Sequence, residues 1–173
     1  MRVFGGKIVA WYFQEMDLLE KMKLKLLLIL CAIFPVLAHG QTVCSLESRE
    51  RLEGFLDDIQ GLDRADGNMN ELVIEIGKWF LNTPYVEKTL ELPGEEQLVI
   101  NLTGLDCTTY LETVVTLARL AKMGKFGFSD YERQLEYLRY ANGRRDAYPS
   151  RLHYFSDWLR QNQEKGILKD VSA

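Results

Sequence analysis

The sequence predicts an α+β domain in which helix dominates. Five segments carry the apolar spacing or the boundary signals of helices. Strand-like runs occur only at residues 98–101 and 167–171. With 47% hydrophobic and 27% charged residues among its 173, the chain has the composition of an ordinary globular protein. We therefore expect one hydrophobic core built mainly from helices.

The first 40 residues differ from the rest of the chain. Lys23 and Lys25 precede an apolar run, residues 26–38, which ends at the small-x-small triplet Ala38-His39-Gly40. This layout is typical of a secretory signal peptide, and the run is shorter than the ~20 residues that span a bilayer as a helix. The alternative, a core helix, needs neither the basic residues nor the small-residue site. We predict an over-extended start at 1–21, a signal peptide at 22–40, and an exported domain at 41–173.

The predicted exported domain is acidic. From Gln41 onward, 22 acidic residues face 16 basic ones, which gives a net charge of −6. Nucleic acids and anionic membranes select basic patches, so neither is expected as a partner. No stable membrane span is expected once the signal peptide is removed. The sequence carries no signal for an oligomeric state.

Two amphipathic helices are expected at the start of this domain. The first covers residues 45–60 and is ended by the turn-rich stretch 61–68. The second covers residues 70–81, and Pro84 prevents its continuation. Their apolar faces consist of Leu52, Phe55, Leu56 and Ile59 in the first helix, and of Leu72, Val73, Ile76 and Phe80 in the second.

The fourth and fifth helices are expected in the last third of the chain. Ser129 and Glu132 have the spacing of a capping box for a helix that runs to Ala141. Asn142-Gly143 would close this helix. The fifth helix is expected at residues 155–166, where Gly166 stops it.

The third helix, residues 107–122, begins at the candidate nucleophile Cys107. Asp106 is a favoured N-cap residue, which places Cys107 at the first helical position. There the helix dipole and unpaired N–H groups stabilise a thiolate, whereas the adjacent Asp106 carboxylate disfavours it. A base is therefore required, and histidine is the usual one. Outside the predicted signal peptide, His153 is the one histidine in the sequence.

The same residues have structural alternatives. Free cysteine is among the most buried residue types, so Cys107 is also compatible with a place in the core. His153, flanked by apolar and aromatic residues, is compatible with a hydrogen-bonded core histidine, and Tyr85 with a packing residue. A Cys44–Cys107 disulfide is the less favoured alternative to free thiols, since Cys44 falls in the expected N-terminal tail. Two distant cysteines and one histidine cannot form a zinc site, and no metal or cofactor is predicted.

Four motifs, in this order and spacing, resemble a bacterial family. They are "NTPYVEKTLE" (82–91), "LDCTTYLETVVTLARL" (105–120), "LRYANG" (138–143) and "SRLHYFSDWL" (150–159). The family is the N-acetylmuramoyl-L-alanine amidase-like family, formerly a domain of unknown function, of the NlpC-type papain-like cysteine hydrolase superfamily. The resemblance covers residues 45–173. It implies the helical N-terminal half of a papain-like fold, with most of the β-sheet missing from this chain.

The resemblance also implies a reaction and a set of site residues. The reaction is hydrolysis of the amide between the muramic acid lactyl group and L-alanine in muropeptides or other peptidoglycan fragments, in the periplasm, during cell-wall turnover. By motif matching, Cys107 corresponds to the nucleophile. The residues matched to substrate contacts or recurrent family positions are Tyr85, Asp106, Thr108, Glu112, Arg151 and His153, the last as a base or a substrate contact.

One departure from the family pattern bears on activity. The family's catalytic histidine belongs to a histidine-valine-glycine motif in a C-terminal strand, beyond the last residue here. The resemblance therefore implies a truncated chain that is inactive alone. It also implies that Leu111, Val114, Val115 and Leu117 need a sheet to cover them. Burial of each such side chain contributes about 1.5 to 3 kcal/mol, so low stability or a molten state is expected.

Three hypotheses follow for the function. The first is an incomplete cysteine amidase of cell-wall turnover. The second is a self-sufficient enzyme in which His153 activates Cys107, which requires a ring nitrogen roughly 3 to 4 Å from the sulfur. The third is a helical periplasmic binding or interaction module in which Cys107 is structural.

Overall fold

The computed structural model describes residues 22–23, 25, 42–62, 68–169 and 171. By its internal contacts the chain separates into residues 1–39 and 40–173, and only the second unit is described below. The predicted over-extended start and signal peptide lie outside the described residues, except for Met22, Lys23 and Lys25. Within the described part, no helix has both the length and the hydropathy needed to cross a bilayer.

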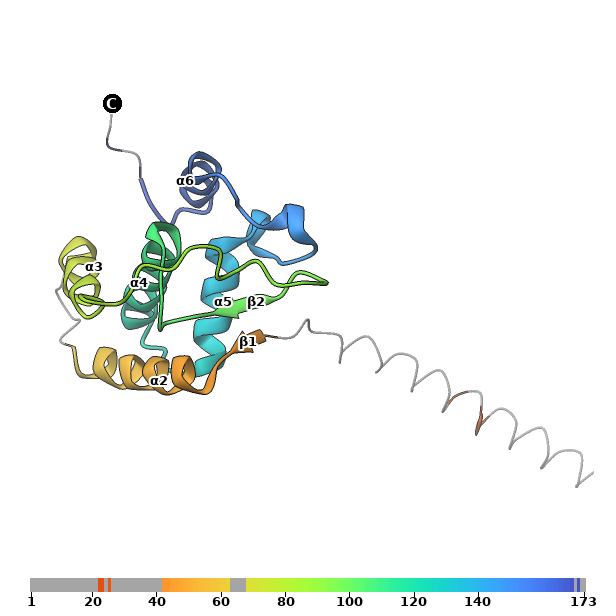
Figure 1. The fold of residues 1–173 in the computed structure, drawn as a ribbon, viewed down its shortest axis with the longest axis horizontal. Helices are drawn as coiled ribbons and strands as arrows, with labels where there is room; N and C mark the ends of the chain where they lie inside the picture. The colour runs from red at the N-terminus through yellow and green to blue at the C-terminus, as the bar shows by residue number, and fades with distance from the viewer. Residues whose placement is uncertain (1–21, 24, 26–41, 63–67, 170, 172–173) are drawn as a thin grey trace, which may run out of the picture. The chain divides into compact units, whose positions relative to one another are not determined.

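Helices dominate the described part of the second unit, as the sequence predicts (Figure 1). The α-helices are α2 (Leu46–Gly61), α3 (Met69–Lys78), α4 (Cys107–Met123), α5 (Phe128–Arg139) and α6 (Phe155–Glu164). Two short 3-10 helices, η2 (Ala141–Gly143) and η3 (Tyr148–Ser150), connect α5 to α6. Helix α4 packs against α2, α3 and α5 and is thus the central element of the bundle.

Two strands form a small parallel sheet beside the helices. Strand β1 (Thr42–Cys44) pairs with β2 (Leu98–Ile100). The prediction of a strand near 98–101 is confirmed, but the prediction that Cys44 lies in a mobile tail is wrong. A three-residue strand is too short to show a period in the sequence, and its partner lies more than 50 residues away.

The strand expected at residues 167–171 is absent from the described residues there. Instead, Gly166 adopts the left-handed conformation, with φ 70°, and reverses the chain. The Ile167 amide then donates to the Asn162 carbonyl at 2.9 Å and caps the end of α6. The segment therefore completes a helix terminus and has no partner strand among the described residues.

Helices α2 and α3 confirm the predicted amphipathic pattern. The Ser45 hydroxyl caps α2 by accepting from the Ser48 amide at 3.1 Å. Helix α3 ends at Lys78, three residues before the predicted end, and a turn carries Phe80 into the core at 4% exposure. The buried members of the two faces are Leu52, Leu56, Ile59, Leu72 and Ile76.

Helix α5 begins and ends earlier than the sequence predicts. Gly127 is its N-cap, and the Gly127 carbonyl accepts from the Asp130 and Tyr131 amides. The prediction of a capping box at Ser129 is therefore wrong, because Ser129 already lies inside the helix. At the other end Tyr140 is extended and forms an antiparallel bridge with Arg151, so the helix cannot continue to Ala141.

Two hydrophobic clusters hold the described helices together. The main core joins α2, α3, α4, α5 and β2. The second cluster consists of Leu138, Leu152 and Trp158, with Leu111, Val115, Ala141, Ile167 and Leu168 partly buried against it. This second cluster attaches α6 to α4 and α5.

The clusters cover the α4 residues for which the sequence predicts a loss of burial. Val114 and Leu117 are buried in the main core, at 2% and 0% exposure. Leu111 and Val115 are partly buried against the second cluster. The expectation of lost burial is therefore wrong for Val114 and Leu117, which the main core covers, whereas Leu111 and Val115 keep part of their surface exposed.

Candidate active site

Cys107 lies exposed at the first position of α4. Asp106 caps the helix: its Oδ1 accepts from the Thr109 amide at 2.8 Å, and the Thr109 hydroxyl accepts from the Asp106 amide at 2.9 Å. The Cys107 Sγ lies 4.0 Å from the Thr108 hydroxyl. The alternative in which Cys107 is a buried core residue is wrong. Cys44 and Cys107 are both free thiols.

A loop segment places Tyr85 beside Cys107. The Val86 amide donates to the Leu105 carbonyl at 3.2 Å, and the Leu105 amide donates to the Pro84 carbonyl at 3.0 Å. Gly104 permits this pairing, because a Cβ there would lie 2.5 Å from Cγ2 of Val86. The segment leaves the Tyr85 side chain 71% exposed next to the start of α4.

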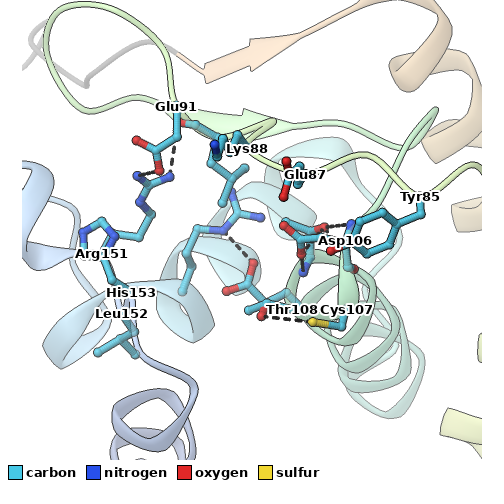
Figure 2. Close-up of a pocket in the computed structure, with 14 residues that line it drawn as sticks. Tyr85, Glu87, Lys88, Glu91, Asp106, Cys107, Thr108, Arg151, Leu152 and His153 are labelled. Carbon is cyan, nitrogen blue, oxygen red and sulfur yellow. Dashed lines mark hydrogen bonds and ion pairs between the residues drawn. The ribbon is translucent and has the colours of Figure 1, made fainter.

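A cavity of about 320 Å³ opens beside Cys107 (Figure 2). It is lined by Tyr85, Glu87, Lys88, Leu90, Glu91, Asp106, Cys107, Thr108, Thr109, Glu112, Arg139, Arg151, Leu152 and His153. All seven site residues proposed from the sequence are among them. Residues from α4, α5 and two separate loops thus converge on one pocket.

Glu112 forms a buried ion pair with Arg139. The Arg139 Nε lies 2.8 Å from Oε2 of Glu112, and the two side chains are 4% and 2% exposed. Arg139 Nη1 also donates to the Val99 carbonyl at 2.7 Å, so the pair links α4, α5 and β2. Burial lowers the pKa of Arg139, but the charge and hydrogen bond of Glu112, together with Tyr140 and Tyr131, outweigh burial and raise that pKa overall. Arg139 is therefore charged, and its guanidinium is held by the ion pair with Glu112.

Arg151 fixes the loop that forms another wall of the pocket. It is 5% exposed, and its guanidinium donates to the Leu90 carbonyl at 3.1 Å and to Oε1 of Glu91 at 2.6 Å. A second carboxylate, that of Glu96, lies 3.5 Å from Nε. These contacts join residues 60 positions apart in the sequence and set the course of the 88–91 loop.

His153 lies on the opposite side of the pocket from Cys107 (Figure 2). Its Nε2 is 2.8 Å from the Tyr148 carbonyl, and its ring lies 4.2 Å from the Tyr148 ring. Because a carbonyl only accepts, Nε2 carries a proton and donates. The side chain is exposed, so it is not the core histidine of the structural alternative.

Metal ligands do not gather in the described part of the chain. Among those residues, no group of three or more His, Cys, Asp and Glu side chains is arranged to hold an ion. Two carboxylates of the pocket have protein partners: Asp106 caps α4, and Glu112 pairs with Arg139.

Residues 75–173 match the N-acetylmuramoyl-L-alanine amidase-like family. The chain belongs to this family. The match begins in α3 and includes Cys107 and every other residue that lines the pocket. No curated protein matches the chain.

Solved structures from three bacteria are similar to this amidase-like chain. An N-acetylmuramoyl-L-alanine amidase from Bacteroides uniformis ATCC 8492 is 37% identical, with a TM-score of 0.54 over 58% of this chain. A structure named as a putative xylanase from Bacteroides fragilis is 39% identical, with a TM-score of 0.53 over 56%. A DUF1460 protein from Legionella pneumophila is 26% identical, with a TM-score of 0.60 over 73%. The chain spans 42%, 42% and 40% of these three structures.

Four charged residues of the amidase-like pocket were not proposed from the sequence. Glu87, Lys88 and Glu91 belong to the motif at 82–91, whereas Arg139 belongs to the motif at 138–143. The motifs that carry the family resemblance therefore contained all four. Local spacing does not tell which members of a motif face a pocket, because that depends on contacts with distant segments.

Proposed function

We propose that this amidase-like chain carries the nucleophile and substrate pocket of a cysteine amidase that cleaves the N-acetylmuramoyl-L-alanine bond of peptidoglycan fragments. The observation that carries the proposal is the exposed Cys107 at the start of α4, within a pocket that all seven proposed site residues line. Membership of the family supports the reaction class. The exposed thiol disfavours a binding module in which Cys107 is structural.

The chemistry follows from the position of the thiol. The Cys107 thiolate attacks the amide carbonyl carbon, and the carbonyl oxygen becomes an oxyanion. The N-cap engages the Thr109 amide and the helix engages the Tyr110 amide. The N–H groups of Cys107 and Thr108 are then the first-turn donors left for the oxyanion. The C–N bond then breaks, the amine of L-alanine takes a proton from water as it leaves, and the acyl group stays on sulfur as a thioester. Hydroxide or water then attacks the thioester, which releases the carboxylate and restores the thiolate.

The second part of the proposal is that His153 does not act as the base for the Cys107 thiol. In the described residues, His153 directs Nε2 to Tyr148 and lies across the pocket from Cys107. We therefore assign His153 to the pocket wall as a substrate contact. We expect the chain by itself not to cleave muropeptides measurably, because no described residue supplies a base to the sulfur.

The proposal also includes a papain-like fold and a periplasmic location for the enzyme. A cysteine at the start of a central helix is the arrangement expected for the helical part of a papain-like, NlpC-type hydrolase. The acidic domain and the signal peptide predicted at 22–40 support action in the periplasm. Peptidoglycan fragments are the substrates that such a location would offer.

Thiol labelling with and without substrate tests this function. We expect iodoacetamide to modify Cys107 faster than Cys44 at neutral pH, and N-acetylmuramoyl-L-alanine to slow that modification. The site of modification is read by peptide mass spectrometry, with Cys107→Ala as the control. A Cys107 thiol that reacts no faster than an unfolded peptide and receives no protection would argue for an interaction module.

Amide cleavage tests the role of His153. We expect no muropeptide cleavage beyond that of Cys107→Ala, measured as release of the L-alanine peptide by mass spectrometry. Robust cleavage that is lost in both Cys107→Ala and His153→Ala would show that these two residues form a working dyad.

A further inference from the structure

We infer that Cys107 stands between two subsites of opposite chemistry, and that the second, aromatic one holds the muramoyl sugar while the charged one holds the peptide. This assignment rests on the proposed function, since it divides that substrate at its cleaved bond. It rests on a second cavity of about 260 Å³, which adjoins the first at the start of α4. The second cavity is lined by Phe80, Thr83, Tyr85, Leu105, Asp106, Cys107 and Tyr110.

The two cavities share their boundary. Tyr85, Asp106 and Cys107 line both of them, so the residue that carries the thiol borders each cavity. An amide carbonyl has two substituents that point away from each other. When the sulfur attacks that carbon from a position between two cavities, one substituent extends into each.

The linings of the two cavities differ in charge. The first contains charges of both signs, including exposed Glu87 and Lys88 and the ion-paired Arg151. The second contains a single charged residue, Asp106, whose carboxylate is engaged in capping α4. The charged cavity suits a peptide with carboxylates, whereas the other suits an uncharged ring with an apolar face.

Aromatic side chains build the second subsite, and their positions are fixed. The Tyr110 hydroxyl donates to the Gly77 carbonyl at 3.2 Å, and its ring meets Phe80 edge to face at 6.1 Å. A Cβ on Gly77 would lie 2.6 Å from that hydroxyl, so the Tyr110 position depends on the glycine. Tyr110 is 38% exposed and therefore presents part of its ring to a ligand.

A polar atom in this cavity also lacks a partner. Among the described residues, the Thr83 hydroxyl is shielded from solvent and makes no hydrogen bond. Shielded hydroxyls usually have partners, because an unsatisfied one destabilises the fold. A sugar hydroxyl or the acetamido group of the ligand would supply the missing bond. Aromatic faces with a hydroxyl at one side are suited to a pyranose ring, which has apolar C–H faces and polar edges.

Two halves of the substrate, offered separately, test the assignment. The probes are N-acetylmuramoyl methylamide, which keeps the lactyl carbonyl uncharged, and the dipeptide L-alanyl-D-glutamate. Binding to the full chain is measured by ¹⁵N–¹H NMR titration, with Cys107→Ala in every protein so that nothing is cleaved. We expect the sugar probe to shift signals around Thr83 and Tyr110, and the dipeptide to shift signals around Lys88 and Glu91.

Matched variants separate the two subsites. Tyr110→Leu removes the ring and keeps an apolar side chain, and we expect it to weaken the sugar probe at least about fivefold without affecting the dipeptide. Lys88→Gln should weaken binding of the dipeptide without affecting binding of the sugar probe. Gly77→Ala, which displaces the Tyr110 hydroxyl without touching a ligand, should also weaken only the sugar probe. Retained amide dispersion shows that each variant is folded.

The possible failures are distinguishable. Sugar binding that survives both Tyr110→Leu and Gly77→Ala, or that is lost in Lys88→Gln, would overturn the subsite assignment while leaving the amidase proposal intact. Absence of binding by either probe overturns the assignment as well. The amidase proposal itself fails only if the intact N-acetylmuramoyl-L-alanine also gives Cys107 no protection from iodoacetamide.

Discussion

Arg139 and Glu112 form an ion pair, 2.8 Å from Nε to Oε2, in which both side chains are almost completely buried beside the Cys107 pocket. The pair connects α4, which carries the thiol, to α5. Removing one partner of a buried pair leaves the other charge uncompensated. We therefore expect Glu112→Ala to lower the free energy of unfolding by about 3 to 5 kcal/mol in urea titrations.

An exposed pair provides the control for Glu112. Arg49 and Glu53 are 3.0 Å apart in α2, and about half of each side chain is exposed. Glu53→Ala should change the free energy of unfolding by less than about 1 kcal/mol, because solvent screens the pair. Equal losses in Glu112→Ala and Glu53→Ala would show that the Arg139 pair is not buried in solution.

Asp106 should contribute to stability as a helix cap. Its carboxylate accepts from the Thr109 amide, which has no partner within the helix. Asp106→Ala is expected to cost about 1 kcal/mol, whereas Asp106→Asn keeps an accepting oxygen and should cost much less. Thermal unfolding followed by circular dichroism measures both. Similar losses for the two variants would contradict capping as the source of the effect.

Gly104 should be intolerant of a side chain. A Cβ at this position would lie 2.5 Å from Cγ2 of Val86, so the segment that carries Tyr85 must move. We expect Gly104→Ala to destabilise the fold by about 1 to 3 kcal/mol and to weaken ligand binding on both sides of Cys107. Gly54→Ala is the matched control: nothing lies within 4 Å of its Cβ, and alanine favours helix, so stability should rise by about 0.5 to 1 kcal/mol. A destabilisation by Gly54→Ala as large as that by Gly104→Ala would contradict the steric explanation.

Tyr131 should make the fold sensitive to alkaline pH. Burial raises the pKa of Tyr131 to about 12, from an ordinary pKa of 10.0. The unfolded chain therefore loses this proton first, so stability falls as pH rises from 10 towards 12, by up to about 2 to 3 kcal/mol. Burial and a hydrogen bond to Glu96 also raise the pKa of Tyr140, in the same direction. Urea unfolding of Tyr131→Phe between pH 8 and 11.5 should show a shallower decline; an unchanged decline would exclude Tyr131 as its source.

Local sequence signals predicted the helices that carry the site. The apolar spacing of 45–60 and the N-cap at Asp106 place α2 and α4 within one or two residues of their observed bounds. Such signals act between residues three or four positions apart, so they can be recognised in the sequence alone. At the start of α5 the local signal was wrong: the helix begins at Phe128, before the predicted Ser129 capping box, and the Phe128 side chain packs against the main core.

The sequence by itself determined a mostly helical domain, a thiol at the first turn of its central helix, and the motifs that belong to an amidase-like family. Only the tertiary structure decided that the thiol is exposed, that Arg139 neutralises Glu112, and that Arg151 holds a loop 60 residues away in the sequence. The physical reason is how far apart in the sequence the interacting residues lie. Helix formation depends on neighbours along the chain, whereas a pocket and its charge pairs depend on side chains that only the packing of distant segments brings together.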